Sequence, residues 1–201
     1  MTTLKNHWHH PIYQICRIGV GLILRTFVRI RVEGRENIPL SGPVIIASNH
    51  IHNFDPPTIG IMIPRFVHFM AKSELYRIRI VGYLLRILGA FPVRRGGQDK
   101  SAIRTALSVP ASGGCLLVFP EGHRSRTGQL GEGMPGVAFI ARRSNCPIIP
   151  CAVRGQYHVG GKVIIRFGQP IAIELADTNE SLIMRVMESI HNLSRDTVGR
   201  Y

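Results

Sequence analysis

The sequence of 201 residues is poor in acidic and aromatic side chains. Only 12 residues are Asp or Glu, against 25 Lys and Arg, so the formal net charge is +13. An excess of this size implies an anionic partner, such as nucleic acid, an acidic membrane surface or a phosphorylated substrate. Aromatic residues make up 7%, and no cluster of them stands among the basic residues. Because single-stranded nucleic acid is bound by stacking on such rings, we expect no nucleic-acid partner.

Cysteine is also scarce, and no two cysteines have the spacing of a CxxC pair. The four are Cys16, Cys115, Cys146 and Cys151. This spacing indicates neither a zinc site nor a disulfide framework, and Cys115 begins the apolar run CLLVF. A reduced intracellular protein with buried thiols fits these positions best.

We expect no secretory signal at the N-terminus, because MTTLKNHWHH lacks a cationic start followed by an apolar stretch and a cleavage site. Residues 11–30 are apolar but contain Arg17, Arg25 and Arg29. Each Arg near a bilayer centre costs about 2.5–3.5 kcal/mol. We therefore expect an amphipathic helix in the membrane interface with its arginines toward lipid phosphates. The alternative is an ordinary amphipathic helix packed on the domain.

Short apolar runs alternate with helical patterns along the rest of the chain. The predicted strands are residues 29–34, 44–48, 66–71, 90–93, 115–119, 147–153 and 163–167, and the predicted helices are residues 80–88, 99–109, 137–143 and 178–194. Such alternation predicts an α/β domain with a mostly parallel or mixed central sheet and helices on both faces. Polar motifs follow three strands: SNHIHNFD, RRGG and PEGHRSR. Because ligands of open α/β sheets gather beyond the carboxyl ends of the strands, the motifs should share one rim.

The stretch SNHIHNFDPP places His50 and Asp55 in a polar turn with four residues between them. A neutral imidazole can take a proton from a hydroxyl, and an adjacent carboxylate fixes its tautomer and stabilises the imidazolium. With His52, the stretch could also be interpreted as a metal-binding site, but a catalytic zinc needs three protein ligands. The other histidines form no second ligand cluster of recognised spacing, so we expect no metal and a surface position for His52. A polar turn without chemistry remains an alternative.

Arginine-rich turns supply two candidate phosphate clamps. Arg124 and Arg126 follow the tight turn of FPEGHRSRTG, where a buried Glu121 could hold one of them in place. Arg94 and Arg95 form the second candidate, beside glycines that let a ligand approach the backbone. Each turn alone is equally compatible with a solvated basic loop.

The order of four motifs, HxxxxD, GAFPVRR, FPEGxRS and PIIPCAVRG, resembles the glycerolipid acyltransferases, and among them the lysophosphatidic acid acyltransferases. The resemblance runs from about Gly34 to Gly168, and FMAKSEL at residues 69–75 adds to it. The resemblance implies residues 34–201 as the acyltransferase domain, and the amphipathic pattern of residues 11–30 predicts residues 1–33 as a membrane-associating segment. Together they lead us to expect an enzyme at the cytoplasmic face of a membrane, peripheral or monotopic.

The resemblance also implies residue roles. His50 would be the general base and Asp55 its orienting partner. Arg94 would contact the acceptor's phosphate, Pro150 would support the acyl side, and the third motif would contribute further acceptor-site residues: Glu121, Gly122, Arg124 and Ser125. No cofactor is expected. The donor would be acyl-CoA or acyl carrier protein, and the acceptor a lysophospholipid. No GxSxG elbow is present, which agrees with direct transfer.

Two positions depart from the family pattern. His123 replaces a threonine of FPEGTRS, and Met134 stands where the family often has a lysine. Both keep open another lyso-lipid or an amino-acid lipid as the acceptor. Two alternatives of another class also stay open: a metal-dependent hydrolase and a basic nucleic-acid-binding module.

Overall fold

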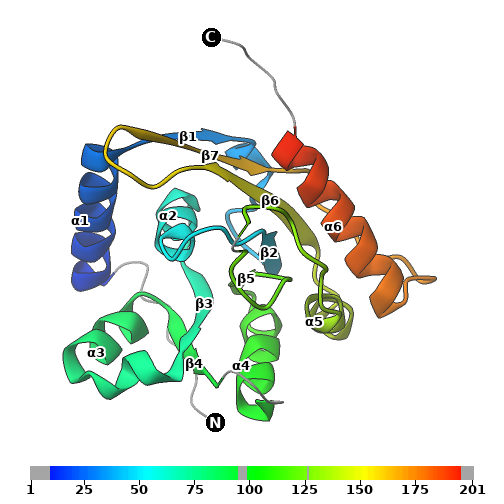
Figure 1. The fold of residues 1–201 in the computed structure, drawn as a ribbon. Helices are drawn as coiled ribbons and strands as arrows, with labels where there is room; N and C mark the ends of the chain where they lie inside the picture. Colours follow the sequence, from blue (N-terminus) through cyan, green and yellow to red (C-terminus); the bar gives the residue numbers. More distant parts are fainter. Residues whose placement is uncertain (1–9, 95–98, 126, 196–201) are drawn as a thin grey trace.

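A mixed sheet of seven strands forms the centre of the computed structural model, which describes residues 10–94, 99–125 and 127–195 (Figure 1). The strands are β1 (Val28–Glu33), β2 (Val44–Ser48), β3 (Val67–Lys72), β4 (Ala90–Val93), β5 (Cys115–Val118), β6 (Ile148–Gly155) and β7 (Gly161–Phe167). Their order is β1-β7-β6-β2-β5-β3-β4. Among these strands of the described residues, β6 and β7 are the one pair that runs antiparallel. This confirms the predicted mostly parallel, mixed sheet.

Helices cover both faces of the sheet, as predicted. They are α1 (Pro11–Phe27), α2 (Asp55–Met62), α3 (Arg79–Ile87), α4 (Lys100–Ala111), α5 (Gly136–Ser144) and α6 (Asn179–Arg195), with short 3-10 helices at Arg35–Asn37 (η1) and Ser73–Arg77 (η2). Figure 1 shows α1, α2 and α3 on one side and α4, α5 and α6 on the other. Helix α2 was not predicted, because its sequence begins Asp-Pro-Pro. Proline is tolerated there, since the amides of a first helical turn have no partner within the helix.

Strand β2 is buried on both faces, as its continuous apolar sequence predicts for a central parallel strand. Ile46 faces the core shared with Ile59 of α2, and Ile45 faces the core shared with Leu182 of α6. All three isoleucines and Leu182 are completely buried. Burying such a side chain contributes about 1.5–3 kcal/mol. The two cores therefore fix the position of the chain that leaves β2.

The N-terminal segment contributes both a helix and an edge strand. Tyr13 of α1 packs with Phe66 and Ile87, and β1 pairs with β7 along its whole length. Residues 28–33, assigned to the membrane-associating segment from sequence, are thus also part of the sheet. A row of large apolar side chains of α1 is exposed: Ile15, Ile18, Leu22, Ile23 and Phe27. Within the described ranges, no helix is both long and apolar enough to cross a membrane.

The arginines of this segment differ in their environment. Arg25 and Arg29 are exposed. Arg17 is half-buried, and its guanidinium donates to the Ile61 carbonyl at 2.9 Å. The expectation that all three arginines face lipid is therefore wrong for Arg17, which instead satisfies a carbonyl near the end of α2.

Candidate active site

The carboxyl ends of five parallel strands meet at one edge of the sheet. Strands β6, β2, β5, β3 and β4 are neighbours in that order, and all five run in the same direction. The HxxxxD segment follows β2, the FPEGHRS segment follows β5, and Arg94 follows β4. The predicted convergence of the three motifs on one rim is therefore what the topology produces.

His50 and Asp55 form a buried hydrogen-bonded pair. His50 Nδ1 lies 2.8 Å from Asp55 Oδ2, and the two side chains are 11% and 0% exposed. The same oxygen accepts the backbone amides of Ile51 and His52, each at 2.7 Å. Asp55 is also the first residue of α2, where the helix dipole favours a negative charge. Because Nδ1 is bonded to the carboxylate, Nε2 is the nitrogen available to a substrate.

The FPEGHRS segment holds His50 from the β5 side. The Phe119 ring stacks on the imidazole, with 4.2 Å between the ring centroids. Glu121 is buried, and its two carboxylate oxygens accept the amides of His50 and Gly131, each at 2.9 Å. The Ser125 amide donates to the His50 carbonyl at 2.8 Å. The bonds that Glu121 makes here go to backbone amides, whereas the sequence suggested that it holds an arginine.

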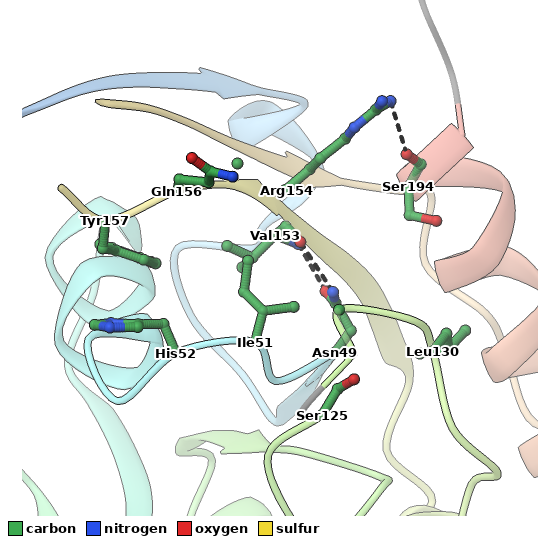
Figure 2. Close-up of a pocket in the computed structure, with 12 residues that line it drawn as sticks. Asn49, Ile51, His52, Ser125, Leu130, Val153, Arg154, Gln156, Tyr157 and Ser194 are labelled. Carbon is green, nitrogen blue, oxygen red and sulfur yellow. Dashed lines mark hydrogen bonds between the residues drawn. The ribbon is translucent and has the colours of Figure 1, made fainter. Parts of the chain in front are cut away.

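Asn49 holds the same turn from the β6 side. Its side-chain nitrogen donates to the Val153 carbonyl at 2.9 Å, and its side-chain oxygen accepts the Val153 amide at 2.7 Å. Figure 2 shows these two hydrogen bonds between the turn and β6. Asn49 is buried, so losing it would leave both backbone groups of Val153 without a partner. The turn that carries His50 is thus fixed to both neighbouring strands.

A cavity of about 690 Å³ opens in front of His50. Its lining includes two cationic side chains, Lys72 at the end of β3 and Arg124 of the FPEGHRS segment. His123, which departs from the family pattern, also lines it, as do Glu121 and Ser125. Ammonium and guanidinium groups beside an imidazole base suit an anionic substrate that carries a hydroxyl.

The other predicted site residues that the structure describes do not line this cavity, and each has a different place in the fold. Arg94 is exposed. The residue before it, Val93, pairs with Lys72, so Arg94 lies at the same rim of the sheet as Lys72. Gly122 has a φ of +69°, and a β-carbon there would come within 2.8 Å of Met134 Cε. Pro150 is buried inside the sheet, paired with Ala47 of β2. Pro150 can thus act on the site only through the strands. Arg95 and Arg126 lie outside the described residues.

A second cavity, of about 490 Å³, adjoins the first one (Figure 2). Ser125 and Leu130 line both cavities. His52 lines the second, is half-buried, and stacks on Tyr157 with 4.7 Å between ring centroids. Among the described residues no group of three or more His, Cys, Asp or Glu side chains is arranged to hold a metal.

Sequence reasoning missed Lys72, Asn49 and Tyr157 as contributors to the site. Lys72 stands in FMAKSEL, which the sequence analysis matched to the family without assigning it a role. Asn49 stands within the quoted turn but forms no recognisable acid–base pattern. Tyr157 comes after the last matched motif, and only the strand order brings it beside His52.

A His–Asp pair fixed at a sheet rim beside a cationic cavity is an arrangement suited to activating a hydroxyl group of an anionic substrate. The family model described as "Acyltransferase" matches residues 29–154. This chain therefore belongs to the acyltransferase family, and the resemblance found in its motifs is confirmed.

Individual relatives agree with this assignment. The chain is 29% identical to a 1-acyl-sn-glycerol-3-phosphate acyltransferase of Bacillus subtilis, over 80% of this chain and 82% of that protein. It is 30% identical to one of Streptococcus pneumoniae, over 76% of this chain and 61% of that protein. The crystal structure of the 1-acyl-sn-glycerophosphate (LPA) acyltransferase PlsC from Thermotoga maritima matches with a TM-score of 0.77 and 24% identity, covering 94% of this chain and 81% of that chain. This likeness shows the same fold.

Proposed function

We propose that this protein transfers a fatty acyl group from an acyl thioester to the free hydroxyl of lysophosphatidate, forming phosphatidate. The observation that carries the proposal is the 2.8 Å bond between His50 and Asp55 at a cavity lined by Lys72 and Arg124. The relatives from Bacillus subtilis and Streptococcus pneumoniae are named for this type of acceptor. Acyl-CoA and acyl carrier protein are both acidic thioesters suited to a protein of net charge +13.

The reaction needs one base and no covalent enzyme intermediate. His50 Nε2 takes the proton of the acceptor hydroxyl as its oxygen attacks the thioester carbonyl carbon. The C–O bond forms, the C–S bond breaks, and the proton passes from the imidazolium to the leaving thiolate. Asp55 stabilises the positive imidazolium that forms transiently. General-base catalysis of this kind typically raises the reaction rate by about 10²–10⁴-fold. Direct transfer of this kind requires no cofactor.

Cations of the cavity give the acceptor its orientation. Arg124 presents a planar guanidinium suited to bidentate phosphate binding, and Lys72 adds a point charge from the neighbouring strand. Arg94 lies at the same rim and supports the phosphate from the β4 side. Binding the phosphate places the hydroxyl within reach of Nε2, which reduces the entropic part of the barrier.

The exposed apolar row of α1 supports attachment to an anionic membrane surface. Arg25 and Arg29 are exposed beside that row, so apolar burial and attraction to lipid phosphates act together. A peripheral or monotopic protein on the cytoplasmic face would meet its insoluble acceptor there.

A panel of acceptors tests the proposal. The purified protein is incubated with one radiolabelled acyl-CoA and, separately, with lysophosphatidate, other lysophospholipids and an amino-acid lipid, and the products are resolved by chromatography. We expect phosphatidate as the main product. His123 lines the cavity where the family has threonine, and this observation favours another lyso-lipid as the second candidate acceptor. If a product formed from another acceptor while lysophosphatidate was not acylated, the assignment of lysophosphatidate as the acceptor would be overturned.

The two rival classes fail for a common reason. A metal-dependent hydrolase and a nucleic-acid-binding module both leave the acyltransferase match over residues 29–154 unexplained.

A further inference from the structure

The two carboxylate oxygens of Asp55 have very different environments. Oδ2 accepts three hydrogen bonds, from His50 Nδ1 and from the amides of Ile51 and His52. Oδ1 is buried and has no hydrogen-bond partner within the part of the chain that the structure describes. A buried carboxylate oxygen without a donor loses the stabilisation that water would supply. Such an atom in an active site requires a physical explanation.

The hydroxyl of Tyr157 is a second buried polar group of this kind. Over the same described ranges it also lacks a hydrogen bond of standard geometry. Tyr157 follows β6, and its ring stacks on His52 at 4.7 Å and lies 6.0 Å from the ring of Phe54. Figure 2 shows the rings of Tyr157 and His52 one above the other. His52 and Phe54 belong to the segment between His50 and Asp55, so this stack holds the tyrosine against the catalytic turn.

Tyr157 and Asp55 interact electrostatically. Burial raises the pKa of Tyr157 above its ordinary value, and the negative charge of Asp55 raises it further. The tyrosine therefore keeps its proton and is a donor at neutral pH. Thr58, one turn beyond Asp55, also interacts with the Tyr157 hydroxyl. Its own hydroxyl proton is donated to the Phe54 carbonyl at 2.6 Å, so Thr58 supplies no donor to Asp55 Oδ1. Cys151 is also near, but burial raises its thiol pKa to about 12, so it stays neutral.

We propose that Tyr157 is a positioning residue whose hydroxyl donates to Asp55 Oδ1. Together with the three donors on Oδ2, this bond fixes the plane of the carboxylate that orients His50. Hydrogen bonds of catalytic groups often tighten only in the reacting complex, and a small closing movement of the stacked turn completes this one. The inference rests on the proposed role of His50 and Asp55 and is independent of which lipid is the acceptor.

Tyr157→Phe tests the proposal because it keeps the stacked ring and removes only the hydroxyl. We expect kcat to fall about 3- to 10-fold, which corresponds to one hydrogen bond of ordinary strength, with the acceptor KM unchanged. The acid limb of the pH–rate profile should move to higher pH by a few tenths of a unit to about one unit. The reason is that a carboxylate without this donor attracts the imidazolium proton more strongly.

The matched control is Tyr76→Phe. Tyr76 also has a buried hydroxyl without a partner in the described chain, and burial raises its pKa to about 12. It belongs to η2 and contacts Arg86 through its ring. We expect Tyr76→Phe to leave kcat and the pH profile at wild-type values.

An NMR titration of the His50 imidazole in the protein without substrate separates this inference from the proposed function. Tyr157→Phe should raise the titration midpoint of His50, and Tyr76→Phe should not. A midpoint shift in a protein that does not acylate lysophosphatidate would support the contact and reject the acceptor. A Tyr157→Phe protein with a lower melting temperature but wild-type kcat, pH limb and midpoint would overturn the positioning role.

Discussion

Replacing Glu121 by Gln should loosen the turn that carries His50. Each carboxylate oxygen of Glu121 accepts one backbone amide, from His50 or from Gly131. A Gln side chain keeps one carbonyl oxygen and turns an NH₂ donor toward the other amide. One of the two amides, the buried one of His50 or the more exposed one of Gly131, then has no acceptor, and the other exchanges a charge-assisted bond for a neutral one.

The size of the effect follows from these two bonds. A hydrogen bond to a charged group contributes about 1.5–3 kcal/mol, and leaving a buried donor unsatisfied costs about 1–3 kcal/mol. We therefore expect Glu121→Gln to lower the free energy of unfolding by about 2–4 kcal/mol. In a domain of this size 1 kcal/mol corresponds to about 2–4 °C in melting temperature, so the expected fall is about 4–16 °C.

Thermal melting and steady-state kinetics on the same preparations measure this outcome. Since the turn carries His50, kcat should fall together with the melting temperature. Glu132→Gln is the matched control, because Glu132 is exposed and adjoins Gly131; its melting temperature should stay near the wild-type value. A Glu121→Gln protein with wild-type melting temperature and kcat but a raised acceptor KM would refute the holding role and support direct substrate contact.

Four further outcomes are expected. Arg124→Lys should raise the acceptor KM several-fold with little change in kcat, because a bidentate contact becomes a point charge; an unchanged KM argues against phosphate binding. Ile18→Asp should reduce sedimentation with anionic vesicles, and full sedimentation would exclude α1 as the contact surface. Cys16, the half-buried cysteine, should react first with iodoacetamide in the native protein, since burial raises the pKa of the other three thiols to about 12. Arg166 lowers the pKa of Glu33, so the stability advantage of wild type over Glu33→Gln should be complete at pH 7 and shrink below about pH 4.3; a pH-independent difference contradicts the ion pair.

Local patterns in the sequence were sufficient to predict the sheet and the pairing of His50 with Asp55. The apolar run at residues 44–48 predicted a strand buried on both faces, and β2 is such a strand. The polar turns after apolar strands predicted a shared rim, because parallel strands align their carboxyl ends. His50 and Asp55 are close in sequence, so a single turn brings them together.

The remaining features depend on contacts between distant residues. Glu121 lies 71 residues from His50, and no local pattern shows that its carboxylate accepts the His50 amide. Lys72 and Tyr157 reach the site only through the order of the strands. The helix α2 was missed because its two prolines suggested a break, although both stand in the first turn.

In the proposed mechanism His50, held by Asp55, deprotonates the acceptor hydroxyl. The most direct measurement is release of free thiol from acyl-CoA, with and without lysophosphatidate, by the wild-type protein and by His50→Ala. We expect lysophosphatidate-dependent thiol release matched by phosphatidate formation in the wild type, and a loss of about 10²-fold or more in His50→Ala. Turnover by His50→Ala at a rate close to that of the wild type would contradict it.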